Sequence, residues 1–323
     1  MATATIERVN LTGIDRYGSY MREAERLSSR GYSYIAATQN RYAAKEAKTI
    51  EERDIASGLA CLRFIDTERD LALSLIPAPQ MPHVPVHKAQ QEAILTCDEF
   101  FGPDDVRTLL VKKVIDHSRL DDSCSARVRN ESTKAIFYII DGGKNLVEGD
   151  FYGAAESHYN TAVILRRLNE NDFAKAFAKL IYSEYMSVNP ITMGKILEKG
   201  KGIVHPYASY RKAAQTAKEF LDPAAVQVAG LSTFWALISH IDSFTDGMIE
   251  HRAKFYKTCD VESKLNEAQE IINQYIPDQD RQGKLTEELR VLASGYWNKL
   301  RNADVTNQDS DNRIDLILKV KRQ

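Results

Sequence analysis

Glycine and proline are scarce in this sequence, at 16 and 9 of 323 residues. With few residues that interrupt helices, apolar side chains recur every three or four positions almost throughout, which is typical of helices rather than strands. The sequence therefore predicts a fold that is nearly all α.

An excess of charge of one sign is also missing, because 43 Lys and Arg residues face 45 Asp and Glu residues, for a net charge of -2. Nucleic-acid-binding proteins usually carry a strongly basic stripe or domain. The near-neutral balance argues against a nucleic-acid partner.

Cysteine is rare, and its four positions form no C-x-x-C pair. This spacing suggests neither a zinc site nor a disulfide framework. We expect buried, reduced thiols at Cys61, Cys97, Cys124 and Cys259.

No charged segment followed by an apolar core marks the N-terminus as a signal peptide, and no apolar run reaches membrane-spanning length. We therefore expect a cytoplasmic protein without a transmembrane segment. The sequence predicts nothing about its oligomeric state.

The common enzyme motifs are absent: there is no phosphate-binding loop, dinucleotide fingerprint, H-E-x-x-H or G-x-S-x-G. One cluster, His240, Asp242, Asp246 and His251, resembles a metal-hydrolase site, since residues 242 and 246 share a helical face. Solvation and helix capping are the alternative explanation for these groups. We expect no metal and no cofactor.

The chain divides into four predicted parts. An N-terminal helical region (1–76) contains a capping box at Thr49 and Glu52. Prolines between 77 and 85 predict a linker (77–88), because they prevent helix formation. A helical domain (89–300) follows, and then a tail (301–323) whose alternation at 314–320 allows a short strand.

Two dipeptides, Asn189-Pro190 and Asp222-Pro223, are typical helix starts. The second opens the most apolar stretch of the chain, residues 224–244. A helix that is apolar on all sides is not a surface helix of a monomer, so this stretch must be buried or face a partner.

Three short motifs occur in an order that resembles a known family. They are a predicted turn at His158-Tyr159-Asn160-Thr161, the pair Tyr210-Arg211, and Gln274-Tyr275 after Ile272. Together they make residues 107–297 resemble the catalytic domain of the Ras-type guanine-nucleotide exchange factors, the group that includes Son of sevenless.

That resemblance implies an all-helical bowl with a protruding helical hairpin, which opens the nucleotide site of a Ras-superfamily small GTPase. Counting from Gly230 places Leu237 at the apolar wedge and His240 or Ile241 at the acidic position, whereas anchoring on Thr245-Asp246-Gly247 selects Asp246 instead. The residues that the resemblance assigns to GTPase binding are Tyr159, Asn160, Phe234, Trp235, Asp242 and Phe244.

The sequence also departs from the family. Residues 227–230 read Gln-Val-Ala-Gly where the family has an aromatic pair that receives the GTPase. A helical GTPase-binding or scaffold protein without exchange activity is therefore the alternative hypothesis. The compact length and divergent motifs are compatible with a bacterial effector that acts in the cytosol of a host cell.

Overall fold

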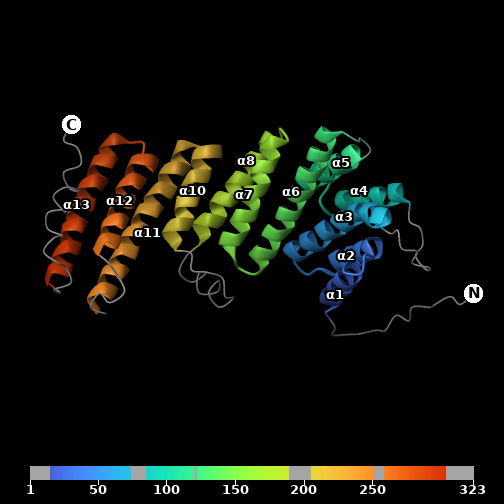
Figure 1. Ribbon diagram of the computed structural model, residues 1–323, viewed down its shortest axis with the longest axis horizontal. Helices are drawn as coiled ribbons and strands as arrows, with labels where there is room; N and C mark the ends of the chain where they lie inside the picture. Colours follow the sequence, from blue (N-terminus) through green and yellow to red (C-terminus); the bar gives the residue numbers. More distant parts are fainter. Residues whose placement is uncertain are drawn as a thin grey trace, which may run out of the picture. The chain divides into compact units, whose positions relative to one another are not determined.

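The computed structural model describes residues 15–73, 85–118, 120, 122–188, 205–250 and 258–302. These residues form twelve helices and no strand, so the predicted all-α fold is confirmed for the described part of the chain (Figure 1). The predicted proline linker, the Asn189-Pro190 helix start and the tail strand lie outside the described residues, apart from the last few residues of the linker.

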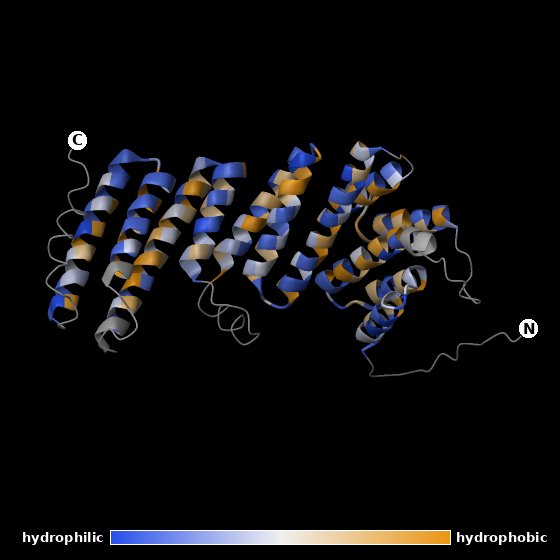
Figure 2. Cartoon of the chain, in the orientation of Figure 1, coloured by the Kyte–Doolittle hydropathy of each residue, from blue (hydrophilic) through white to orange (hydrophobic). Residues whose placement is uncertain are grey.

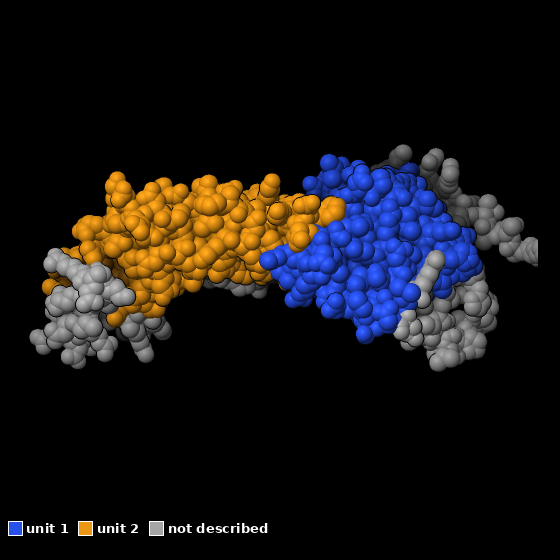
Figure 3. Space-filling view, turned by 90° about the horizontal axis from the view of Figure 1, so that it is seen from above, with its two compact units in different colours: residues 1–148, 163–170 blue, residues 149–162, 171–323 orange. Residues whose placement is uncertain are grey.

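The chain forms two compact units, one of residues 1–148 and 163–170 and the other of residues 149–162 and 171–323 (Figure 3). Unit 1 contains the first six helices: α1 (Arg16–Ser28), α2 (Ser33–Glu46), α3 (Ile50–Leu73), α4 (Val86–Phe100), α5 (Val106–Ser118) and α6 (Ser123–Val147). Unit 2 contains the first part of α7 (Phe151–Arg167) and all of α8 (Asn171–Ser187), α10 (Pro206–Phe220), α11 (Pro223–Glu250), α12 (Thr258–Tyr275) and α13 (Gln279–Asn302).

The division between the units does not fall at the proline-rich segment. Helix α3 precedes this segment and α4 follows it, yet the two helices pack against each other within unit 1. Helix α4 already begins at Val86, inside the range predicted as linker. The N-terminal helices therefore share a core with α4 to α6.

Unit 1 is organised around α3, which packs against α2, α4, α5 and α6. Thr49 caps its N-terminus as predicted, because the Thr49 hydroxyl accepts from the Glu52 amide at 3.1 Å. The Glu52 carboxylate reaches back one residue further than in a standard capping box and accepts from the Lys48 amide at 2.9 Å. Small residues let the helices approach closely. A Cβ added to Gly58 of α3 would lie only 2.7 Å from Ile140 of α6.

In unit 2, α8, α10, α11, α12 and α13 pack in succession, each against the next (Figure 1). The Asp222 side chain caps α11 as predicted, because it accepts from the Ala225 amide at 2.9 Å. Gly230 allows α11 to approach α12, since an added Cβ would lie 2.6 Å from the Tyr275 Cβ. Each of these five helices contributes buried apolar residues to the core of unit 2.

Helix α11 is rich in apolar residues (Figure 2) and is the one helix among the described residues that is long and apolar enough to cross a membrane. A core helix of a soluble protein has the same composition, and α11 packs between α10 and α12. The described residues thus contain no clear transmembrane segment.

Candidate functional site

Most of the predicted site residues lie on α11, where they divide between a buried and an exposed face. Phe234, Leu237 and Ile241 are completely buried in the core of unit 2. The spacing of three and four residues places them on one face of the helix, toward its neighbours. The predicted apolar wedge, Leu237, is therefore a core residue in this conformation.

The opposite face of α11 presents a different set of side chains. Val228 and Trp235 are 52% and 44% exposed, although both are large and apolar. Spacings of seven, seven and four residues place Asp242 and Asp246 on the same side of the helix as these two. We call Val228, Trp235, Asp242 and Asp246 the α11 stripe; it is apolar at one end and acidic at the other.

Two neighbours support the stripe. The Trp235 ring meets the buried Phe234 ring edge-on, with centroids 5.0 Å apart, so one edge of the indole is held in the core. Lys299 of α13 forms an ion pair with Asp246 at 3.4 Å. Both partners of this pair are largely exposed, and such pairs contribute about 0–1 kcal/mol to stability.

His240 lies on a third side of α11, within an aromatic cluster. Its ring centroid is 4.1 Å from that of His205, 5.3 Å from that of Tyr207 and 6.2 Å from that of Phe244. Burial lowers the pKa of His240, and electrostatic interactions with His205 and Lys264 lower it further, while Glu267 opposes the shift. The neutral imidazole is thus favoured, which does not suit the acidic position that one alignment assigns to His240.

A polar network extends this cluster from α10 to α12. The Lys264 ammonium donates to the Tyr207 hydroxyl at 2.7 Å and to Glu267 at 2.9 Å, and Arg211 donates to Glu267 at 2.8 Å. Of these residues, the sequence motifs singled out only Arg211, as part of the pair Tyr210-Arg211. His205, Lys264 and Glu267 follow no motif, because only packing on α11 brings α10 and α12 together.

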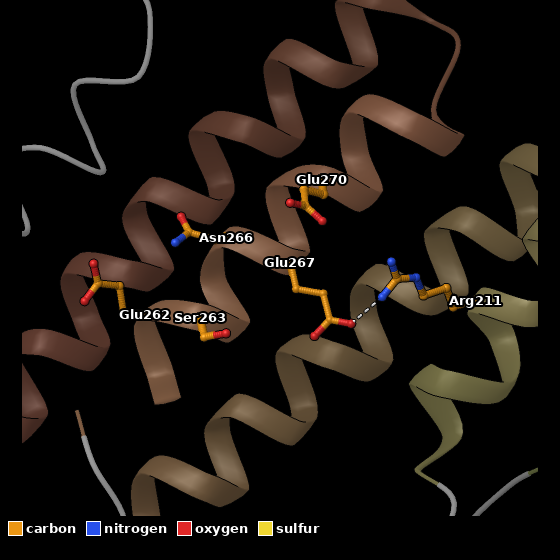
Figure 4. Close-up of a pocket in the computed structure, with 6 residues that line it drawn as sticks. All are labelled: Arg211, Glu262, Ser263, Asn266, Glu267 and Glu270. Carbon is orange, nitrogen blue, oxygen red and sulfur yellow. Dashed lines mark hydrogen bonds and ion pairs between the residues drawn. The ribbon is translucent and has the colours of Figure 1, made fainter. Parts of the chain in front are cut away.

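Beside the network lies a shallow groove of about 520 Å³ between α10 and α12 (Figure 4). Three carboxylates and one guanidinium dominate its charge, so it suits a polar or basic group better than an apolar ligand. The residues that line it are Arg211, Glu262, Ser263, Asn266, Glu267 and Glu270.

The predicted turn at residues 158–161 is wrong, because these residues lie in the interior of α7. Asn160 is exposed, as a partner-binding residue would be. The half-buried Tyr159 donates its hydroxyl to Glu219 at 3.3 Å. His158 instead points into the core, where its Nδ1 lies 2.8 and 2.9 Å from the two carboxylate oxygens of Glu184.

The metal-hydrolase hypothesis finds no support in the described part of the chain. No group of three His, Cys, Asp or Glu residues in this part is arranged to hold a metal ion. His240 faces His205 and Tyr207, whereas Asp242 and Asp246 belong to the α11 stripe. His251 lies outside the described residues.

Searches for similar proteins found no match to a family model, to a curated protein or to a solved structure.

Proposed function

We propose that this chain binds a Ras-superfamily small GTPase through the α11 stripe and acts as a helical binding protein. The observation that carries the proposal is the exposure of Trp235 and Val228 on the same helix face as two carboxylates. Exposed tryptophan side chains at protein surfaces are frequent anchors of binding interfaces. The resemblance to the exchange-factor family supplies the class of partner.

The two ends of the stripe favour a partner surface with an apolar pocket beside basic residues. Covering the exposed part of Trp235 removes apolar area from water, and truncating such an anchor commonly costs about 2 kcal/mol or more of binding free energy. The half-buried Asp242, and Asp246 with its partner Lys299, would contribute mainly to the association rate, because charges at an interface rim steer the encounter of two proteins.

Burial of the predicted wedge is the reason to prefer binding over exchange. Fully burying an apolar side chain is worth about 1.5–3 kcal/mol, so freeing Phe234, Leu237 and Ile241 together would cost about 5–9 kcal/mol. A GTPase would have to supply this free energy before Leu237 could reach its nucleotide site. The α11 stripe needs no such opening.

Binding can be tested with a panel of Ras, Rap, Ral, Rab and Rho proteins, each GDP-bound or nucleotide-free, on a biosensor surface. We expect one member to bind and Trp235→Ala to weaken that binding by about thirtyfold, which corresponds to about 2 kcal/mol. Val291→Ala is the matched control, because Val291 is also an exposed apolar residue but lies on α13. The proposal would be refuted if both variants lost the same amount of binding affinity, or if no GTPase of the panel bound the chain.

Exchange activity is the second candidate, favoured by the order of the motifs at Asn160, Tyr210-Arg211 and Gln274-Tyr275. It requires the bowl and the protruding hairpin that the family resemblance implies. Release of a fluorescent GDP analogue from each GTPase of the panel separates the two functions. Accelerated release at micromolar protein would establish exchange, whereas binding without acceleration supports the binding protein.

A further inference from the structure

Two cysteines meet in the core of unit 1. Cys61 of α3 and Cys97 of α4 are 36 residues apart in sequence, and their sulfur atoms lie 2.8 Å apart. Both side chains are almost completely inaccessible to solvent. The Cys61 sulfur also lies 3.6 Å from the backbone carbonyl oxygen of Ala93, so α3 and α4 approach closely at this point.

This separation is shorter than that of two thiols in ordinary contact. A disulfide has its sulfurs about 2.05 Å apart, so the bond needs a relative movement of about 0.8 Å. The third described cysteine, Cys124, is exposed at the start of α6 and takes no part in the contact, so the expected burial of this thiol is wrong. In the described residues the pair also lacks the further ligands that a metal site would require.

We propose that Cys61 and Cys97 form an intramolecular disulfide bond that fastens α3 to α4. With a low-molecular-weight disulfide such as oxidised glutathione, one thiolate attacks the oxidant and releases one glutathione thiolate. The second cysteine thiolate then attacks the mixed disulfide and releases the other. Two protein thiols are oxidised, and one oxidised glutathione is reduced to two molecules of glutathione.

The surroundings of the pair determine when this reaction is fast. Burial raises the pKa of the Cys61 thiol, and the hydrogen bond to Cys97 raises it further. The thiolate is the attacking species, so oxidation of the packed core is slow. The bond therefore forms during folding, or when α3 and α4 separate, and then persists once the helices have packed.

The direct test uses the full chain with Cys124→Ser and Cys259→Ser, which leaves one possible pairing. The reduced, unfolded protein is refolded with oxidised glutathione, unfolded again in N-ethylmaleimide and digested for mass spectrometry. We expect a linked peptide that contains Cys61 and Cys97. Recovery of both residues as maleimide adducts after refolding would overturn the proposal.

Thermal unfolding gives an independent measurement on the chain with all its cysteines. Closing the loop between Cys61 and Cys97 should raise the melting temperature of unit 1 by about 5–15 °C. Thermal unfolding is measured by circular dichroism. Dithiothreitol should abolish this increase, and Cys97→Ala should show no difference between oxidised and reduced protein. The fluorescence of Trp235 and Trp297 reports only on unit 2, and its transition should not move. If the melting temperature of Cys97→Ala shifted equally between oxidised and reduced protein, the Cys61–Cys97 disulfide would not be its cause and the proposal would be overturned.

Discussion

The buried pair of His158 and Glu184 makes a quantitative prediction about unit 2. Only 5% and 4% of the two side chains are exposed, and His158 also packs edge-on against Phe177. Burial raises the pKa of Glu184, while the hydrogen bond and charge of His158 oppose this shift. Removing the imidazole should therefore leave a buried carboxylate without compensation.

We expect His158→Leu to destabilise unit 2 by about 3 kcal/mol at pH 7, because it leaves the buried Glu184 carboxyl without its hydrogen-bond partner. Protonation of Glu184 sets an upper limit on this destabilisation, because the buried carboxyl can become neutral instead of staying charged. Neutralising a carboxyl of ordinary pKa, about 4.3, costs about 3.7 kcal/mol at pH 7 and about 1 kcal/mol at pH 5. The double variant His158→Leu/Glu184→Leu should recover most of the loss, because an apolar pair of similar volume replaces the hydrogen-bonded polar pair.

The two variants differ only at residue 184, so the difference between their free energies of unfolding reports the effect of the Glu184 carboxyl alone. A raised folded-state pKa gives a contribution to stability that is complete below the unfolded-state pKa and is lost as pH rises through the folded-state pKa. The single variant should therefore lie about 3 kcal/mol below the double variant at pH 7 and about 1 kcal/mol below it at pH 5.

Urea unfolding followed by tryptophan fluorescence is the appropriate assay, because both tryptophans of the chain, Trp235 and Trp297, belong to unit 2. A loss of about 3 kcal/mol should lower the midpoint by about 1–3 M urea. Glu287→Leu, at a largely exposed site on α13, is the control and should change the midpoint little. If the single and double variants have the same pH dependence, the reasoning about Glu184 is refuted.

Three further predictions concern α11 and its contacts, and the same fluorescence assay measures each. Gly230→Ala should cost about 1–3 kcal/mol, because the new methyl group would collide with Tyr275, whereas Gly295→Ala, with no atom within 4 Å, should stabilise α13 by about 0.5–1 kcal/mol. Leu237→Ala should cost about 2–5 kcal/mol because it leaves a cavity in the core, and an unchanged midpoint would contradict the burial of this residue. Because burial lowers the pKa of His240 in the folded state, stability should fall as pH drops below about 6.5. His240→Gln should flatten this dependence, while His87→Gln, at an exposed site in α4, should retain it.

The helix starts predicted from capping residues are confirmed where the structure describes them. Thr49 with Glu52, and Asp222 with Pro223, predict helix starts that the side-chain hydrogen bonds confirm. The predicted turn at residues 158–161 failed because it rested on a family motif. The local sequence of α7 contains one glycine, Gly153, and no proline, which is typical of an uninterrupted helix.

The sequence by itself determined the helical class and the need for residues 224–244 to be covered, because both follow from the spacing and apolar character of neighbouring residues. Tertiary structure alone decided what covers them: α10 and α12 bury Leu237 and leave Trp235 exposed on the other side of the helix. It also decided the pairing of His158 with Glu184 and of Cys61 with Cys97. These partners are 26 and 36 residues apart, and such contacts depend on how whole helices pack rather than on any local pattern.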